Sequence, residues 1–183
     1  MIYPNGNHKW IPSQDKNADM KTYESWNLQW TEFRQDGINL FIQDVHKQVK
    51  DHYPQTMISV TITSDIEETG SRYMQDWEDW LRNDYIDFLI PRAYADNQQE
   101  LESILQKWHI PLETYPTRIK MGLISYSGSN QSLQVKTPEA FIKEIDSLES
   151  AGLNGFLIFH LENMNDLQLN TLKAHFLERQ LEN

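Results

Sequence analysis

Arg92, Tyr94 and Asp96 stand at every second position directly after an apolar run, in the stretch DYIDFLIPRAYADN that spans residues 84–97. Because side chains alternate between the two faces of a β-strand, Arg92 and Tyr94 point the same way. A charged group that points inward from an otherwise apolar strand needs a partner, which favours a binding role for both residues. Asp96 fits equally well as a site carboxylate or as a charge beside the positive N-terminus of a following helix.

Three further strand-like segments also end in polar side chains. In parallel βα folds the C-terminal ends of the strands meet at one edge, where the following loops build the site. We therefore expect the polar strand ends to lie close together in space. The residues at these three ends are Asp65, Tyr126, His160 and Glu162.

Carboxylates, hydroxyls, aromatic rings and an arginine on one edge suit a neutral, polyhydroxylated ligand. Rings stack on sugar faces, and fixed carboxylates and arginine bond to hydroxyl groups. Two carboxyl groups at a suitable separation can also act as acid and base on a glycosidic bond. The sequence thus predicts a carbohydrate site, with Asp65, Asp96 and Glu162 as catalytic candidates. The candidates for substrate binding are Arg92, Tyr94, Tyr126, His160 and Trp10.

Several of these candidates have a simpler structural explanation. Asp65 begins an acidic run, and exposed acidic loops are commoner than catalytic ones. His160 and Glu162 could lie in an ordinary loop between a strand and a helix. Trp10 lies in a polar N-terminal stretch, where its ring could stack on a sugar or pack over the strand ends.

Other kinds of site have little support in the sequence. The histidines are scattered without metal-ligand spacing, and the chain has no cysteine, hence no thiolate nucleophile and no disulfide. No G-x-S-x-G serine motif is present. The turns at 69–71 and 125–130 lack the spacing of a dinucleotide fingerprint and the lysine of a phosphate loop. We expect no metal and no cofactor.

The overall composition excludes several classes of partner. The 183 residues are about the size of one domain, and their net charge of −11 and pI of about 4.9 argue against nucleic acid, which needs a basic face. No apolar run approaches the roughly 20 residues that span a bilayer, and the start MIYPNGNHKW lacks the order of a signal peptide. The sequence alone does not indicate a cellular location.

Apolar spacing predicts one domain over 1–183, with a long N-terminal loop region at 1–33 and a helix followed by four βα units at 34–183. Short apolar runs predict the strands, with β-branched alternation at 57–63, and capping signals predict helices that begin at Ser71, Asn97 and Thr137. The Trp77 and Trp80 side chains share a helix face and are predicted to be core. A proline-marked connection is expected at 109–117. The predicted strands are 57–63, 86–94, 118–128 and 155–163.

Two architectures have such βα repetition: an open doubly wound sheet and a (β/α)8 barrel. The open sheet usually carries a glycine-rich phosphate turn, which is missing here. We therefore expect an α/β fold, the parallel (βα)4 half of a (β/α)8 TIM-like barrel.

Three stretches carry a family resemblance: INLFIQDVHKQVKDHYPQTMISVTIT, YMQDWEDWLRNDYIDFLIPRAYA and RIKMGLISYSG. Together they resemble the C-terminal half of bacterial glycosyl hydrolase-like proteins related to family ten. The similarity covers roughly residues 34–162. Its most specific part is the block from Asp76-Trp77 through Pro91 and Tyr94.

The resemblance implies a (β/α)8 barrel that acts on polysaccharide, often at the cell surface, so a full-length parent would be secreted or surface-bound. Pro91 and Tyr94 match the end of the family's sixth strand, and His160 to Asn163 match the last strand end by position only. Family members carry an acid on strand four in a pattern like D-x-x-x-Y-P. This sequence starts with MIYP, in which Tyr3-Pro4 matches the end of that pattern. The acid is therefore expected to precede Met1.

Three functional hypotheses follow from the sequence. The first is a glycoside hydrolase-like protein that acts on or binds a polysaccharide. The second is a non-catalytic carbohydrate-binding or assembly module, and the third is a truncated fragment that lacks the strand-four acid. Four parallel strands alone leave two open edges and one uncovered face, so a homodimer or the missing N-terminal half of the barrel is the expected protein partner.

Overall fold

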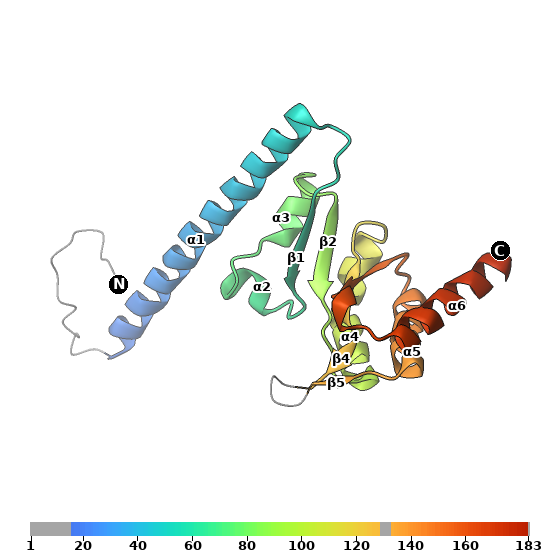
Figure 1. The fold of residues 1–183 in the computed structure, drawn as a ribbon. Coiled ribbons are helices and arrows are strands. Elements are labelled where there is room, and N and C mark those ends of the chain that lie inside the picture. Colours follow the sequence, from blue (N-terminus) through green and yellow to red (C-terminus); the bar gives the residue numbers. More distant parts are fainter. Residues whose placement is uncertain (1–15, 129–132, 183) are drawn as a thin grey trace.

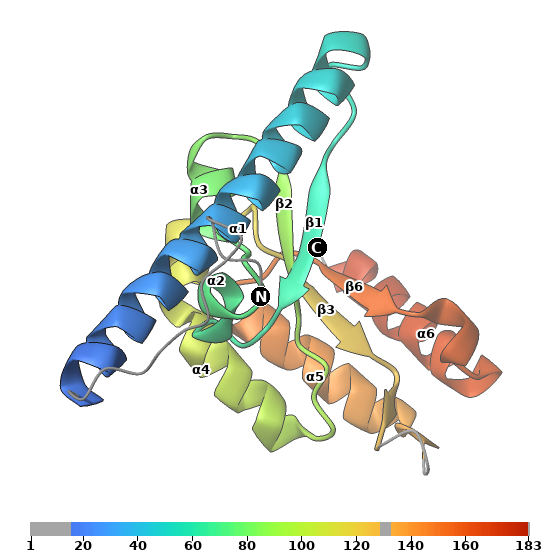
Figure 2. The same cartoon turned by 90° about the vertical axis from the view of Figure 1, so that its left-hand side faces the viewer.

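The computed structural model describes residues 16–128 and 133–182 and shows a mixed α/β fold (Figure 1). Four strands form a parallel sheet in the order β1-β2-β3-β6 (Figure 2). They are β1 (Ser59–Thr63), β2 (Phe88–Arg92), β3 (Met121–Ile124) and β6 (Phe156–Phe159). A short antiparallel hairpin pairs β4 (Tyr126–Ser127) with β5 (Gln134–Val135). The parallel sheet is that of a partial α/β barrel, as the sequence predicts.

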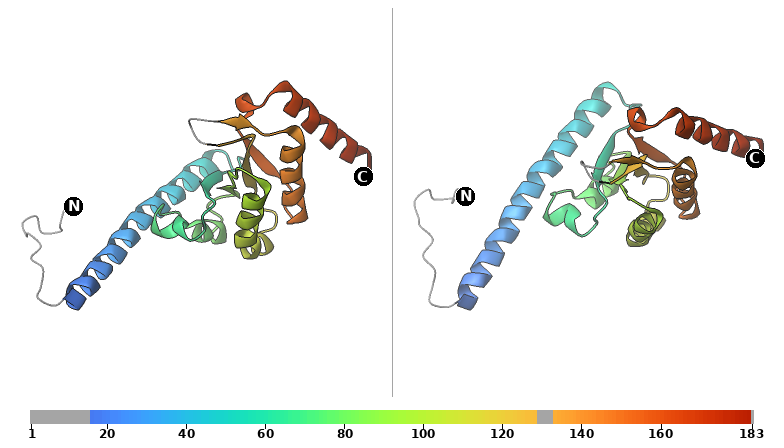
Figure 3. Two further views of the ribbon diagram at one scale, coloured as in Figure 1. Left: turned by 90° about the horizontal axis from the view of Figure 1, so that it is seen from below. Right: turned by 60° about the horizontal axis from the view of Figure 1, so that its bottom comes forward.

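Helices connect these strands and flank the sheet. In Figures 1 and 3 the first helix (blue) and the last helix (red) lie on opposite sides of the sheet, and Figure 2 shows the last helix beside β6. The helices are α1 (Lys16–His52), α2 (Glu68–Ser71), α3 (Trp77–Arg82), α4 (Gln98–Thr114), α5 (Pro138–Ser150), the 3-10 helix η1 (Leu161–Asn163) and α6 (Asp166–Glu182).

The hydrophobic core lies between one face of the sheet and the helices. Alternate residues of the strands, such as Ile62, Leu89 and Leu123, are almost fully buried in it. Trp77 and Trp80 are buried there too, which confirms their prediction as core, and the Trp77 ring lies 5.2 Å from that of Trp108. The helical side of the sheet is therefore packed as in a complete barrel.

The opposite face of the sheet, which we call the open face, leaves large apolar side chains exposed. Leu157 is 38% exposed and Phe159 is 42% exposed. Parallel sheets are normally covered on both faces, so this exposure is unusual. Among the described residues, β1 and β6 also pair with one neighbouring strand each. The strand residues of the open face include Thr61, Thr63, Arg92, Leu157 and Phe159.

Pairing between the two central strands is interrupted at Pro91. The Leu89 N–H donates to the Arg118 carbonyl at 2.9 Å, and the Lys120 N–H donates to the Leu89 carbonyl at 2.9 Å. Two residues later Pro91 occupies the position whose N–H would form the next bond, and proline has none. The remaining register contact of β2 with β3 is Arg92 with Gly122.

The N-terminal region differs from its prediction as a loop over 1–33, because α1 begins at Lys16. From residue 13 to residue 36 the sequence contains no glycine or proline, so nothing interrupts the helix that continues into the apolar pattern at Ile38. The second half of α1 is anchored to the domain. Asn39 Oδ1 accepts a 2.7 Å hydrogen bond from Trp80 Nε1, and Lys50 pairs with Asp87 at 2.9 Å.

Two further helix boundaries differ from the prediction, and each of the four parallel strands is shorter than predicted. Ser71 was expected to begin a helix but ends α2, and α3 follows Asp76 after a break that includes Met74 at a φ of 57°. The connection expected at 109–117 is helical up to Thr114, because α4 continues through Pro111. Burial of Trp108, Pro111 and Leu112 offsets the hydrogen bond that the proline removes.

The other predicted helix starts are confirmed. Asn97 caps α4 by accepting a hydrogen bond from the Glu100 N–H at 3.1 Å, and Glu100 accepts one from the Asp96 N–H at 2.8 Å. Thr137 caps α5 through the Ala140 N–H at 3.2 Å, with Pro138 at the first helical position. These reciprocal bonds satisfy N–H groups that the helix itself leaves unpaired.

Candidate functional site

The C-terminal ends of the four parallel strands form one edge of the sheet, which we call the rim. Strand register brings one residue from each strand to the same level just below this edge, and residues paired in register point to the same face. The rim comprises residues 64–65, 93–96, 126–128 and 159–162. The residues at the level below it are Thr63, Arg92, Gly122 and Leu157.

An aromatic pair occupies the centre of the rim. The rings of Tyr94 and Phe159 are stacked, with centroids 5.5 Å apart and planes inclined by 26°. The His160 ring lies 4.4 Å from that of Phe159. Phe159 is the last residue of β6 and Tyr94 follows the end of β2, and these two strands lie on either side of β3, as in a barrel layer built from alternate strands. The rim therefore offers a half-exposed aromatic surface.

Phe159 was missed in the sequence, where the run Phe156–Phe159 was interpreted only as strand. Its period of two is the signal that could have found it. Phe156 and Ile158 pack against the core, so Leu157 and Phe159 must point to the open face.

Arg92 and Tyr94 lie on the open face and at the rim, respectively. The Arg92 Nε donates a 3.3 Å hydrogen bond to the Ile62 carbonyl, and the rest of its guanidinium is exposed. Burial raises the pKa of the Tyr94 hydroxyl, and the nearby charge of Arg92 lowers it only in part. Tyr94 therefore stays protonated at neutral pH and can donate a hydrogen bond.

Asp96 and Tyr126 are brought together at the β4–β5 hairpin. Asp96 Oδ1 accepts a 2.8 Å hydrogen bond from the Gly128 N–H, which fixes the segment after Tyr94 against the hairpin. Tyr126 pairs in β4 with Val135 and is half-buried, close enough to Tyr94 for the two hydroxyls to interact. The carboxylate of Asp96 thus has a structural role as well as its exposed position.

A buried ion pair supports this part of the rim from below. Lys136 Nζ donates to both carboxylate oxygens of Glu144, at 2.7 and 2.9 Å, and to the Ala95 carbonyl at 2.8 Å. Burial raises the pKa of Glu144, and the charge of Lys136 opposes the shift. The buried Gln168 side chain donates to the carbonyls of Ser125 and Lys136. This network fixes the backbone between Tyr94 and Asp96, although nothing in the local sequence pattern pointed to it.

His160 and Glu162 do not share a strand face, because β6 ends at Phe159 and Leu161–Asn163 form η1. The Glu162 Oε1 still lies 3.4 Å from His160 Nδ1, and the Glu162 side chain is 80% exposed. Asn163 Nδ2 is 2.9 Å from the same ring nitrogen.

Two candidates remain, Asp65 and Trp10, and neither is placed at the aromatic pair. Asp65 Oδ1 accepts the Glu67 N–H at 3.1 Å, as in a local turn at the end of β1. Trp10 lies outside the described residues. Within residues 16–128 and 133–182, no three acidic or histidine side chains are placed to hold a metal ion.

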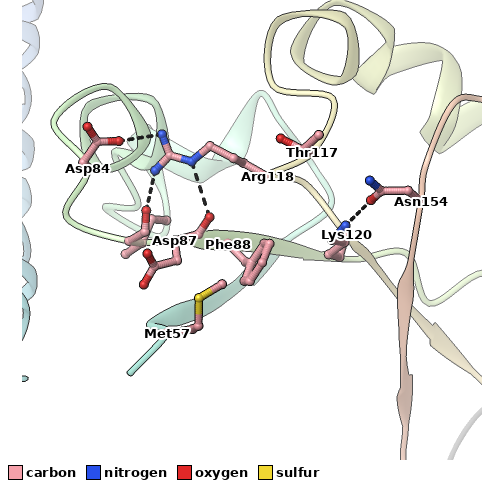
Figure 4. A pocket seen from close by; sticks show the side chains of 9 residues that line it. Met57, Asp84, Asp87, Phe88, Thr117, Arg118, Lys120 and Asn154 are labelled. Atoms are coloured by element: carbon pink, nitrogen blue, oxygen red, sulfur yellow. Dashed lines mark hydrogen bonds and ion pairs between the residues drawn. The ribbon is translucent and has the colours of Figure 1, made fainter. Parts of the chain in front are cut away.

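A pocket of about 590 Å³ lies at the other end of the sheet, near the N-terminal ends of the strands (Figure 4). Arg118 dominates it and is fully bonded to the protein. Its guanidinium donates to the carbonyls of Leu81, Asp87 and Ile86 and to the Asp84 carboxylate. Figure 4 also shows Lys120 directed to Asn154, beside Phe88. These satisfied contacts indicate a structural role for this end.

Comparison with known proteins identifies the family of the chain. No curated protein matches it. In the described part, no helix has both the length and the apolar character needed to cross a membrane. The family model of glycosyl hydrolase-like 10 matches residues 5–138, which include β1 to β5 and the candidates Asp65, Arg92, Tyr94, Asp96 and Tyr126. Phe159, His160 and Glu162 lie beyond the matched segment. Because the match covers most of the sequence, the chain belongs to the glycosyl hydrolase-like 10 family.

Proposed function

We propose that the rim binds a polysaccharide chain and that Tyr94 and Phe159 stack against its sugar rings. The observation that carries this proposal is the stacked pair itself, with Phe159 42% exposed. Exposed aromatic rings at the C-terminal ends of parallel strands lie where βα folds bind their ligands. Membership of a glycosyl hydrolase-like family supports a sugar as that ligand.

The neighbouring side chains supply hydrogen bonds to sugar hydroxyls. Tyr94 donates through a hydroxyl that burial keeps protonated. Arg92, Tyr126 and His160 surround the stacked pair and are exposed or half-buried, so their polar groups remain accessible. Such a mixture of rings and convergent polar groups is the usual composition of a ligand site.

Hydrolysis of the bound chain is the proposed activity. It requires a carboxylic acid that protonates the leaving oxygen and a second carboxylate that acts on the sugar or on water. Asp96 and Glu162 are the candidates nearest the stacked pair in sequence, and Asp65 at the end of β1 is the third. The 80% exposed Glu162 side chain can approach a ligand held on the rim.

The test is hydrolysis of a dye-labelled polysaccharide by the full chain and its Asp96→Asn and Glu162→Gln variants. Each change removes proton transfer, so we expect a loss of about 100-fold or more. Glu113→Gln removes an exposed carboxylate of α4 and serves as the matched control, with unchanged activity. Hydrolysis that survives both rim changes would show that these carboxylates are not catalytic.

A non-catalytic binding module is the second candidate function. The observation that favours it is the local bonding of two carboxylates: Asp65 accepts the Glu67 N–H, and Asp96 accepts the Gly128 N–H. In that case the chain binds oligosaccharides saturably and cleaves none at any pH. Calorimetric titration together with product analysis by chromatography separates the two functions.

The open face requires a cover for either function. We propose that a second four-stranded half completes the sheet, either a second copy of this chain or strands of a longer parent protein. Light scattering on the purified chain distinguishes the two. A dimer mass supports the second copy, whereas a monomer that binds a hydrophobic dye supports the longer parent.

A further inference from the structure

Arg92 lacks the partner that other arginines of the fold have. Four of them pair with carboxylates: Arg72 with Glu68, Arg82 with Glu78, Arg118 with Asp84, and Arg179 with Asp146 and Glu149. In residues 16–128 and 133–182 no carboxylate lies within 4 Å of Arg92, and its single hydrogen bond is that from Nε to the Ile62 carbonyl. Its two terminal nitrogens are left for another acceptor.

The surroundings of Arg92 leave space for that acceptor. At its level of the open face it lies between Thr63 on β1 and Gly122 on β3. Threonine is short and glycine has no side chain, so neither strand neighbour covers the guanidinium. Arg34 also has no carboxylate partner among the described residues, but it lies on the exposed part of α1, away from the sheet.

The stacked pair stands one level above Arg92 on the same face. Tyr94 is two residues further along the chain, and two residues span at most about 7 Å. Burial raises the pKa of the Tyr94 hydroxyl and the charge of Arg92 lowers it in part, which is consistent with this proximity along the chain. A pyranose ring stacked on Tyr94 and Phe159 would therefore place a substituent of the ring within reach of the guanidinium.

We infer that the ligand carries a carboxylate on its sugar ring, as in a uronic acid, and that Arg92 binds this carboxylate. The inference rests on the proposed carbohydrate-binding function and adds one charged group to the neutral ligand expected from the sequence. A guanidinium matches a carboxylate with two parallel hydrogen bonds, which a hydroxyl does not offer. The net charge of −11 opposes non-specific binding of polyanions, so the attraction has to be local.

The experiment compares oligogalacturonate and oligomannuronate with their methyl esters, which keep the same sugars but lose the charge. Affinities are measured by calorimetry at 0.15 M salt for the wild type and for Arg92→Gln, Arg92→Lys and Arg34→Gln. We expect the wild type to bind at least one acid about tenfold more tightly than its ester. Arg92→Gln should abolish this preference, because it lowers the affinity for the acids much more than the affinity for the esters.

The other two variants control for charge and geometry. Arg34→Gln removes the same charge from the exposed helix and should keep the full preference. Arg92→Lys keeps the charge without the planar fork and should retain a smaller preference. Circular dichroism confirms that each variant is folded.

The outcomes separate this inference from the function on which it rests. Equal binding of acids and esters by the wild type overturns the uronic-acid inference and leaves carbohydrate binding intact. A preference that persists in Arg92→Gln overturns the role of Arg92. Absence of binding to acids, esters and neutral oligosaccharides alike overturns the proposed function, and the inference with it.

Discussion

The two ends of the parallel sheet use arginine in opposite ways. At the N-terminal end, Arg118 donates to three backbone carbonyls and one carboxylate, so its charge is fully used by the fold. At the C-terminal end, one level below the rim, Arg92 makes one 3.3 Å bond and is otherwise exposed. The same residue type is structural where its donors are satisfied and is available for a ligand where they are not.

Removal of each arginine is the strongest test of this contrast. Arg118→Met should lower the free energy of unfolding by about 3 kcal/mol, because three carbonyls lose their partner. The exposed Asp84 contributes little to this loss. Arg92→Met should change stability by less than about 0.5 kcal/mol. Urea denaturation of the two variants measures both values, and similar losses would break the contrast.

The buried pair beneath the rim should give a comparable effect that depends on pH. Lys136→Met leaves Glu144 buried without its partner and should cost about 3 kcal/mol at neutral pH. Burial raises the pKa of Glu144 above its ordinary value of 4.5, so the stability that the neutral carboxyl contributes is present below that value and is lost as pH rises. Without Lys136 that loss is larger.

The variant should therefore be closest to the wild type in acid and fall further below it as pH rises. Urea denaturation from pH 4.5 to pH 8 measures this difference. As a control, Lys143→Met removes an exposed lysine from α5, the helix that carries Glu144, and should have little effect at any pH. A difference that does not vary with pH would contradict the role of Glu144 ionisation.

Phe159→Ala should change stability only a little, and it sharpens the functional side of the contrast. The ring is 42% exposed, so its loss should cost about 1 kcal/mol of stability or less. Oligosaccharide affinity should fall about tenfold, because stacking on a ring is worth roughly this much. Leu157→Ala removes a similarly exposed apolar side chain of β6, one level below the rim, and should weaken binding less. Calorimetry with one neutral oligosaccharide compares them.

The parts of the fold set by local signals could be predicted from the sequence. Short apolar runs predicted all four parallel strands, and the side chains of Asn97 and Thr137 predicted two helix starts. The helix over 16–33 was missed because its many polar residues were interpreted as a loop, while the absence of glycine and proline was the signal that mattered.

The candidate site was predicted only where strand ends define it. Arg92 and Tyr94 follow from the alternation within one strand. Phe159 stacks on Tyr94 from the far side of β3, and the bond of Lys136 to Ala95 joins residues 41 positions apart. Such contacts depend on the order and register of strands, which no local pattern contains.

Pro91 also has a mechanical consequence for the whole sheet. Proline removes a hydrogen bond between β2 and β3, so these two strands are paired less extensively than the other neighbours. The sheet thus consists of two well-paired halves, β1 with β2 over five residue pairs and β3 with β6 over four. Transient separation of the strands should therefore occur between β2 and β3. The amide hydrogens of one half would then exchange with solvent independently of those of the other half. A ligand that contacts both Tyr94 and Phe159 would hold the two halves together.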